Sequence, residues 1–182
     1  MTAVVTRPAW VIGGHVRPSA DPVERAVHEV FVAHYGRLAG WAGHLIGDRE
    51  LGHDVATEAF TRLLSHWQTV DDPRPWLYAT AGNLVRDHWR KRGREGSAYE
   101  RYQGGRDDPE TAAPGPDLAQ GVSVRTAVEG LPDRLRLPVL LFYFGDLSVA
   151  EVARQLGRSE GAVKRDLYDA RARLATTLGE AR

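Results

Sequence analysis

The densest group of residues able to do chemistry is a basic run in the middle of the chain. Five cationic side chains fall within nine residues: Arg86, Arg90, Lys91, Arg92 and Arg94. Such a concentration of positive charge is costly unless a polyanion meets it. Because the chain has 24 basic and 24 acidic residues in total, this local clustering, and not net charge, predicts binding of nucleic acid.

Enzyme chemistry has no comparable signal. His34, His44, His53 and His66 lie on mixed helical faces without metal-ligand spacing such as H-E-x-x-H. Gly13-Gly14 lacks the pattern of a phosphate loop. The absence of cysteine excludes disulfides, thiolate zinc sites and cysteine nucleophiles. We therefore expect no enzymatic activity, no metal and no cofactor.

A second functional pattern lies near the carboxy terminus, between Ser148 and Val163. The small Ala153 allows two helices to approach closely, Gly157 can adopt the positive φ of a tight bend, and Val163 can anchor the second helix to the first. This combination predicts a helix-turn-helix. A helical hairpin that does not touch DNA is the alternative, and we consider it less favoured.

Capping residues set the boundaries of this motif. Ser148 with Glu151 three residues later forms a capping-box pattern, and Ser159 can cap the second helix. Residues near the start of that helix would reach base edges and phosphates of DNA. The candidates are Arg158, Ser159, Glu160, Lys164, Arg165 and Tyr168.

Hydrophobic periodicity predicts an all-α fold with seven helices and no strand. The expected helices are 22–47, a second from about 48 to the loop at 71–75, then 76–92, 124–131, 134–144, 148–156 and 159–178. We expect two small helical domains, 23–95 and 123–182, the second containing the helix-turn-helix. The segment 96–122 is rich in Gly, Pro and Asp, which predicts a flexible linker and independently mobile domains.

The amino-terminal segment 1–22 is expected to be a disordered tail or a regulatory contact through Trp10 and Ile12. Its apolar run is too short for a signal peptide or a membrane span. We therefore expect a cytoplasmic protein.

The segment from Pro75 to Arg92 resembles the minus-ten recognition helix of extracytoplasmic-function (ECF) sigma factors, members of the sigma-70 family of RNA polymerase subunits. The preceding helix, with Asp48, Asp54 and Phe60, is similar to the family's polymerase-binding helix. Leu131-Pro132 and the helix-turn-helix resemble the family's fourth region. The likeness extends from about Val27 to Leu178.

The resemblance implies which residues act. Contacts with the minus-ten element would come from Arg74, Asn83, Arg86, Asp87, Arg90, Lys91 and Arg92. Contacts with polymerase would come from Asp54, Val55, Glu58, Phe60 and Arg62. The loop from His66 to Arg74 would capture a single-stranded base, with Trp67, Trp76 and Trp89 serving the core. Asp166 and Asp169 stand where relatives carry basic residues, and we expect them to narrow the DNA sequences tolerated.

These features favour a sigma factor that binds core RNA polymerase and directs promoter recognition and transcription initiation. Its partners would be promoter DNA, the clamp of the largest polymerase subunit, the flap of the second-largest subunit and an anti-sigma factor, without membrane contact. The alternatives are a stand-alone helix-turn-helix regulator, which would bind DNA with its carboxy-terminal half alone, and an interaction protein without DNA function.

Overall fold

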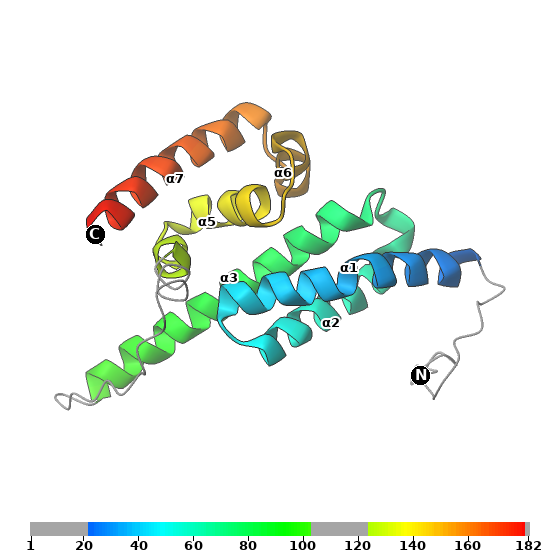
Figure 1. The fold of residues 1–182 in the computed structure, drawn as a ribbon, viewed down its shortest axis with the longest axis horizontal. Helices are drawn as coiled ribbons and strands as arrows, with labels where there is room; N and C mark the ends of the chain where they lie inside the picture. The colour runs from blue at the N-terminus through cyan, green and yellow to red at the C-terminus, as the bar shows by residue number, and fades with distance from the viewer. Residues whose placement is uncertain (1–21, 103–123, 181–182) are drawn as a thin grey trace, which may run out of the picture.

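The computed structural model describes residues 22–102 and 124–180, and all regular secondary structure in these ranges is helical. Figure 1 shows the three amino-terminal helices as one layer and the carboxy-terminal elements above it. The elements are α1 (Pro22–Ile46), α2 (Arg49–His66), η2 (Trp67–Thr69), α3 (Pro73–Tyr102), a helical segment at 124–129, α5 (Asp133–Val139), η3 (Leu140–Phe144), α6 (Val149–Leu156) and α7 (Glu160–Glu180). The all-α prediction is confirmed.

The corner between α1 and α2 depends on glycine and on one capping carboxylate. Gly47 has φ +80°, a conformation that costs glycine little. The Asp48 carboxylate accepts hydrogen bonds from the first backbone N–H groups of α2 at 2.8 and 3.1 Å. A Cβ on Gly52 would lie 2.5 Å from the backbone oxygen of Ala39, so the two helices pack backbone to backbone.

The helix α3 is longer than the sequence predicted. It was expected to end near Arg92, with the linker starting at residue 96, but its backbone is helical to Tyr102. Gly93 and Gly96 were interpreted as breaks, yet one glycine inside a helix costs only about 1 kcal/mol relative to alanine. The predicted tail and most of the predicted linker, residues 1–21 and 103–123, lie outside the described residues.

The carboxy-terminal half differs from the prediction at the expected helix 134–144. An α-helical segment gives way at Leu140 to a five-residue π-helical turn. The turn ends with Gly145 donating its N–H to the Leu140 oxygen at 2.8 Å, and Leu147 donates to the Leu141 oxygen at 3.1 Å. This turn connects η3 to the start of α6.

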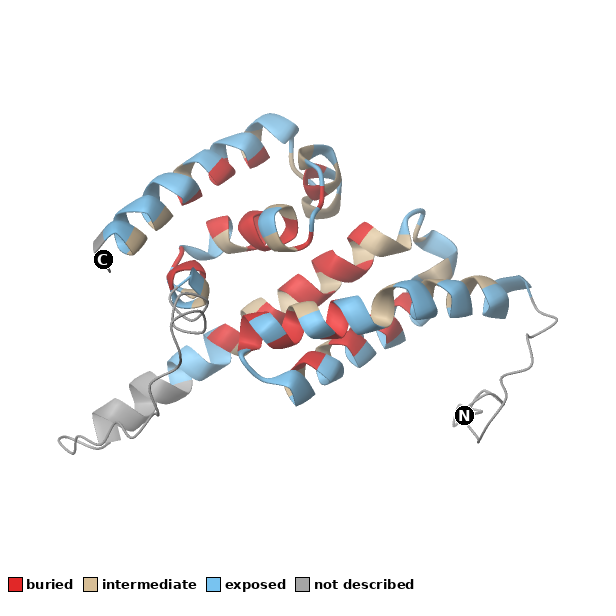
Figure 2. Ribbon diagram, viewed as in Figure 1, coloured by how far each residue is buried: buried red, intermediate tan, exposed pale blue. Residues whose placement is uncertain are grey.

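The two halves pack against each other in this structure. The helix α3 contacts α5, η3 and α6, and the buried side chains of both halves form one apolar cluster. Figure 2 shows buried residues on α3 facing buried residues of the carboxy-terminal elements. The expectation of independently mobile domains therefore does not describe this state, because an apolar surface on α3 is covered by α5 and η3.

Within residues 22–102 and 124–180, no helix is long and apolar enough to cross a membrane.

Candidate nucleic-acid interface

The helix-turn-helix has the predicted geometry. Gly157 ends α6 in the left-handed conformation, with φ +60° and ψ +37°. Arg158 then donates its backbone N–H to the Ala153 oxygen at 2.9 Å, which closes the turn. Ala153 and Val163 are both buried between α6 and α7. Each of the three positions that predicted the motif has the expected role.

Both predicted caps are present. At the start of α6, Glu151 donates its N–H to the Ser148 hydroxyl at 3.2 Å, and its carboxylate accepts the Ser148 N–H at 2.7 Å and the Ser148 O–H at 2.6 Å. These hydrogen bonds hold the pKa of Glu151 below its ordinary value. At the start of α7, Ala162 donates its N–H to the Ser159 hydroxyl at 3.2 Å.

The first turns of α7 present an exposed surface of mixed charge. Glu160, Lys164 and Arg165 are exposed, and Tyr168 is 68% exposed. Lys164 Nζ lies 3.6 Å from a carboxylate oxygen of Glu160 one turn earlier. These side chains are accessible from solvent, and the Glu160 carboxylate reduces the positive charge around Lys164.

Asp166 does not belong to that surface, although the sequence analysis expected it to narrow the DNA sequences tolerated. It is 2% exposed and forms an ion pair with Arg158, while Arg134 Nε lies 3.8 Å from its other oxygen. Asp169 is half-buried and pairs with Arg134 at 3.0 Å. A direct contact of Asp166 with DNA is thus excluded in this conformation, and the carboxylate instead holds Arg158 and Arg134 against α7.

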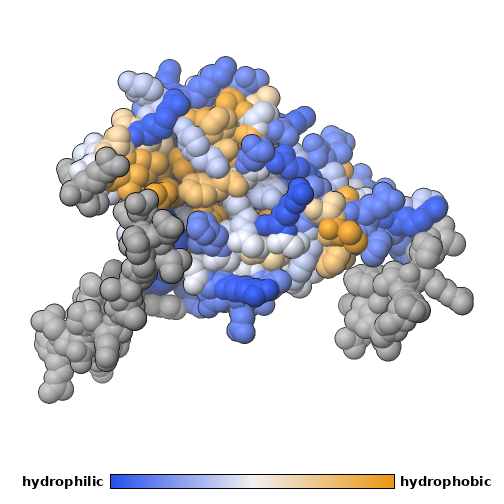
Figure 3. Space-filling view, viewed as in Figure 1, coloured by the Kyte–Doolittle hydropathy of each residue, from blue (hydrophilic) through white to orange (hydrophobic). Residues whose placement is uncertain are grey.

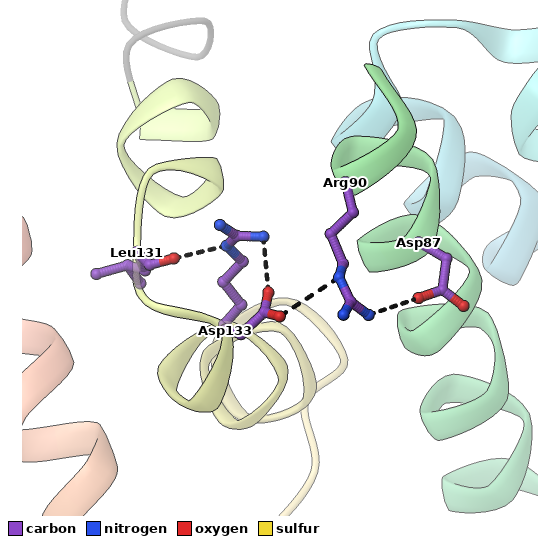
Figure 4. Close-up of polar contacts among 5 residues, drawn as sticks. Asp87, Arg90, Leu131 and Asp133 are labelled. Atoms are coloured by element: carbon purple, nitrogen blue, oxygen red, sulfur yellow. Dashed lines mark hydrogen bonds and ion pairs between the residues drawn. The ribbon is translucent and has the colours of Figure 1, made fainter. Parts of the chain in front are cut away.

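The exposed basic end of α3 carries the second predicted DNA surface. Asp87, Arg90, Lys91 and Arg92 are exposed, and Arg90 Nη1 lies 3.3 Å from Asp87 (Figure 4). Arg86 is half-buried.

Asn83 is half-buried instead of lying on an open face. Its amide Nδ2 donates to the Ala79 oxygen at 3.0 Å, which fixes the side-chain orientation and leaves Oδ1 as an acceptor.

Arg74, in the first turn of α3, has an unexpected set of partners. Its Nη2 donates to the backbone oxygens of Gly145 and Asp146, each at 3.1 Å, and its guanidinium lies 5.7 Å from the ring centre of Tyr78. Burial raises the pKa of Tyr78, against the opposing effect of Arg74. Burial and the neighbouring Arg74 lower the pKa of His34.

Trp67, Trp76 and Trp89 serve the core, as predicted. Trp89 is 2% exposed, and Trp67 and Trp76 are partly buried against the apolar cluster.

The exposed face of α2 carries the residues predicted to bind polymerase. Asp54, Glu58 and Arg62 are exposed, and Arg62 donates to Glu58 at 2.8 Å. Val55 is half-buried. Phe60 is only 5% exposed, and its ring packs edge-on against the Phe31 ring, with 5.2 Å between the ring centres. Phe60 therefore lies beneath this exposed face and packs against it from the core side.

Comparisons with known proteins agree with this arrangement. The model of sigma-70 region 2 matches residues 30–95, and the model of sigma-70 region 4 matches residues 121–174. The ECF RNA polymerase sigma factor BldN of Streptomyces coelicolor is 30% identical over 189 residues, covering 90% of this chain and 70% of BldN. The chain belongs to the ECF sigma factors.

Other relatives support the same family. The ECF sigma factor SigM of Bacillus subtilis is 29% identical over 133 residues, covering 70% of this chain and 79% of SigM. The sigma factor RpoE of Bartonella quintana, solved with the anti-sigma factor NepR, has a similar fold, with a TM-score of 0.60 and 19% identity over 87% of this chain and 99% of RpoE. As a member of this family, the present protein binds core RNA polymerase and directs promoter recognition.

In this sigma factor, the region 2 match covers most of α1, all of α2 and the basic part of α3, and the region 4 match includes the helix-turn-helix. The sequence analysis missed the residues that join the two regions: Gly82, Glu129, Asp133 and Leu137. No local pattern marks them, since their partners are distant in sequence. The burial of Asp166 did have a signal, because position 166 falls between Val163 and Ala170 on the buried face of α7.

Proposed function

We propose that this sigma factor divides promoter recognition between two surfaces. Region 2, within residues 23–95, would bind the minus-ten element through Asn83 and the cationic end of α3. Region 4, within residues 123–182, would bind the minus-thirty-five element through the start of α7. The observation that carries the proposal is that each matched region has its own exposed surface with cationic side chains, one at the end of α3 and one at the start of α7.

The physical basis differs between the two surfaces. A sigma factor must hold single-stranded bases at the minus-ten element, for which fixed amides and backbone-binding cations suffice. A recognition helix presents its first turns to the major groove of duplex DNA. The exposure of Lys164 and Arg165 on the second turn of α7 fits this second task.

Polymerase would be held at two places. The exposed acids Asp54 and Glu58 on α2 fit a basic partner such as the clamp of the largest subunit. A largely apolar hollow of about 370 Å³, with Arg171 in its lining, lies between the helical segment 124–129, η3 and α7, and it would receive the flap of the second-largest subunit. Its apolar lining consists of Val124, Val128, Val139, Tyr143, Phe144 and Leu174.

Figure 3 shows apolar side chains gathered on the surface of the carboxy-terminal half, beneath α7. A contiguous apolar surface on a charged protein is typical of a site for another protein. An anti-sigma factor is a further proposed partner, since RpoE of Bartonella quintana was solved in complex with one. We place the protein in the cytoplasm, where polymerase acts, and propose no enzymatic activity of its own.

The test is transcription with purified core polymerase on a library of randomised promoters. The wild-type chain should select paired minus-thirty-five and minus-ten sequences. Lys164→Ala/Arg165→Ala should relax selection at the upstream element only, and Asn83→Ala should relax it at the downstream element only. Selection that is unchanged in both variants, in holoenzyme of wild-type stability, would refute the assignment.

A further inference from the structure

Two arginines around the helix-turn-helix are turned toward carboxylates of α7. Arg158, in the turn, forms an ion pair with Asp166, which is 2% exposed. Arg134, in the first turn of α5, donates to Asp169 at 3.0 Å, and its Nε lies 3.8 Å from the other oxygen of Asp166. The four side chains join α5, the turn and α7 in one charged network, on the side of α7 that faces α5 (Figure 1).

The two ion pairs differ in how far they are removed from water. The pair of Arg134 with Asp169 joins side chains that are 61% and 36% exposed. Water and salt screen such a pair, so Arg134 can exchange Asp169 for another anion at little cost. The pair of Arg158 with Asp166 is different, because its carboxylate is buried. If Arg158 left, Asp166 would stay in the interior without an adequate counter-charge, which is strongly destabilising.

Arg158 nevertheless lies where a helix-turn-helix meets DNA. It directly precedes Ser159, whose hydroxyl caps the start of α7. A recognition helix presents its first turns to the major groove, which brings the preceding turn close to the DNA backbone. A free guanidinium at this position would form charge-assisted hydrogen bonds with a phosphate. The sequence alone therefore predicts that Arg158 contacts DNA.

The Asp166 carboxylate removes most of what that contact would contribute. A cation attracts DNA mainly because it neutralises phosphates and releases their condensed counterions. An arginine whose charge is balanced by a buried carboxylate adds little net charge to the surface, so it releases few counterions. Lys164 and Arg165 differ from Arg158 in this respect, because both are exposed. The carboxylate nearest to Lys164, that of Glu160, is exposed as well.

We propose that Asp166 limits the number of backbone contacts that region 4 makes with the minus-thirty-five element, because it holds Arg158 within the protein. Binding of this element then depends more heavily on the exposed side chains of α7. A promoter with a mismatched element falls below the affinity that transcription requires. Asp166 thus acts through Arg158 and narrows the range of promoters without touching DNA. The inference rests on the proposed binding of the minus-thirty-five element by the start of α7.

The test measures promoter binding by holoenzyme made with the full chain, over a salt range of about 50 to 200 mM. One duplex carries the minus-thirty-five and minus-ten sequences selected in transcription. A second duplex differs from it only by mismatches in the minus-thirty-five element. The salt slope of binding counts backbone contacts, so a purely structural role of Asp166 would leave it unchanged. Urea denaturation of each variant verifies that region 4 is folded.

The test variant is Asp166→Asn, which keeps the side-chain shape and releases Arg158. It should steepen the salt slope by roughly one unit and tighten binding to both duplexes by at least about threefold at the lowest salt. Transcription from the mismatched promoter should rise when holoenzyme is limiting. Asp169→Asn is the matched control, because it makes the same charge change on α7 in a pair that is already exposed. The control should keep the wild-type slope and bind within about twofold of wild type.

Arg158→Ala/Asp166→Asn separates an effect through Arg158 from an effect of charge alone, because its net charge equals that of the wild type. It should have the wild-type salt slope and affinity. A slope about one unit lower than that of the wild type would show that Arg158 already contacts a phosphate, and would overturn the inference even if the single variant does not fold.

The inference is also overturned if Asp166→Asn has an unchanged or lower salt slope, or if the double variant keeps the steeper slope of the single variant. If holoenzyme made with the wild-type chain binds the matched and mismatched duplexes equally, the proposed function of α7 fails and the inference fails with it.

Discussion

Arg158, at the turn of the helix-turn-helix, forms an ion pair with Asp166, a carboxylate that is 2% exposed two turns into α7. The Arg158 side chain itself is 31% exposed. The ion pair therefore links the turn to the recognition helix on the side of α7 that faces the protein interior. It gives Arg158 a structural task that is separate from its expected contact with DNA.

We expect Arg158→Ala to destabilise region 4 by about 2–3 kcal/mol, because it leaves the buried Asp166 carboxylate with only the distant Arg134. Arg158→Ala/Asp166→Asn should recover part of that loss, since the remaining amide carries no charge. The free energies of unfolding of both variants can be measured by urea denaturation, with the fluorescence of probes on α7 as the signal. Equal stability of the single and double variants would contradict the structural role.

Recovery of stability also separates folding from DNA binding. If the double variant is stable yet loses protection of the minus-thirty-five element, Arg158 contacts DNA as well. If protection returns with stability, its role in recognition is only to hold the turn.

The capping box at the start of α6 should make region 4 sensitive to acid. We expect Glu151→Ala to cost about 1 kcal/mol at neutral pH. The pKa of Glu151 is lowered below its ordinary value of 4.5 by the Ser148 hydrogen bonds. The stabilisation is therefore fully present above pH 4.5 and is lost as the pH falls through the lowered, folded-state pKa.

Hydrogen exchange of the α6 amides, measured as a function of pH, tests this expectation. The difference in α6 amide protection between wild type and Glu151→Ala should become smaller as the solution becomes acidic. Glu29→Ala, at an exposed position on α1, provides the control and should leave the α6 amides unchanged at every pH. A difference in protection that grows at low pH would contradict the predicted direction of the pH dependence.

The α2 surface leads to a prediction about polymerase. Asp54→Lys/Glu58→Lys should weaken assembly with core enzyme by at least about tenfold, because both acids are exposed and reversal makes them repel a basic partner. Glu24→Lys/Glu29→Lys makes the same charge change on α1 and should assemble normally. Co-sedimentation with core enzyme gives the answer, and circular dichroism checks that the helices remain.

The apolar hollow of region 4 leads to a prediction of a different kind. Tyr143 is 46% exposed at its lining. Tyr143→Glu should reduce transcription from promoters that depend on the minus-thirty-five element by at least about fivefold, since a charge there disfavours an apolar partner. Binding of the isolated duplex element should stay unchanged, because Tyr143 lies outside α7. Loss of duplex binding would place the defect in folding or DNA contact instead of in polymerase contact.

The elements of this fold could be predicted where a local pattern carried the information. The period of apolar residues gave the bounds of α1 within a residue or so, and Ser148, Gly157 and Ser159 fixed the helix-turn-helix. The π-helical turn escaped detection because its sequence, Leu140–Phe144, is uniformly apolar and shows no change of period.

The closed arrangement of the two regions could not be predicted, for a physical reason. The contact of Gly82 with Leu137 and the pair of Arg92 with Glu129 join positions far apart in the chain. Each residue also has an adequate local explanation, as a weak helix position or a solvated charge. The DNA contacts themselves remain predictions.

Asn83 and the cations of α3 should contribute to binding in different ways, and the last prediction separates them in holoenzyme. There the expected effect of Arg90→Ala or Arg92→Ala is the loss of one phosphate contact. Each such change should lower the salt slope of binding by roughly one unit and weaken all promoters about equally.

Asn83→Ala should instead cost about 1–3 kcal/mol at the preferred minus-ten base and much less at other bases, with little change in salt slope. The structure sharpens this expectation, because the amide Nδ2 is held by the Ala79 oxygen and Oδ1 is left to accept from a base. Asn83→Asp keeps that acceptor, removes the internal hydrogen bond and adds a charge, so it should weaken every promoter. Binding to a panel of minus-ten variants at several salt concentrations distinguishes the classes. If Asn83→Ala weakens all promoters equally, Asn83 only holds α3 in shape, and base readout belongs to Asp87 or to the loop from His66 to Arg74.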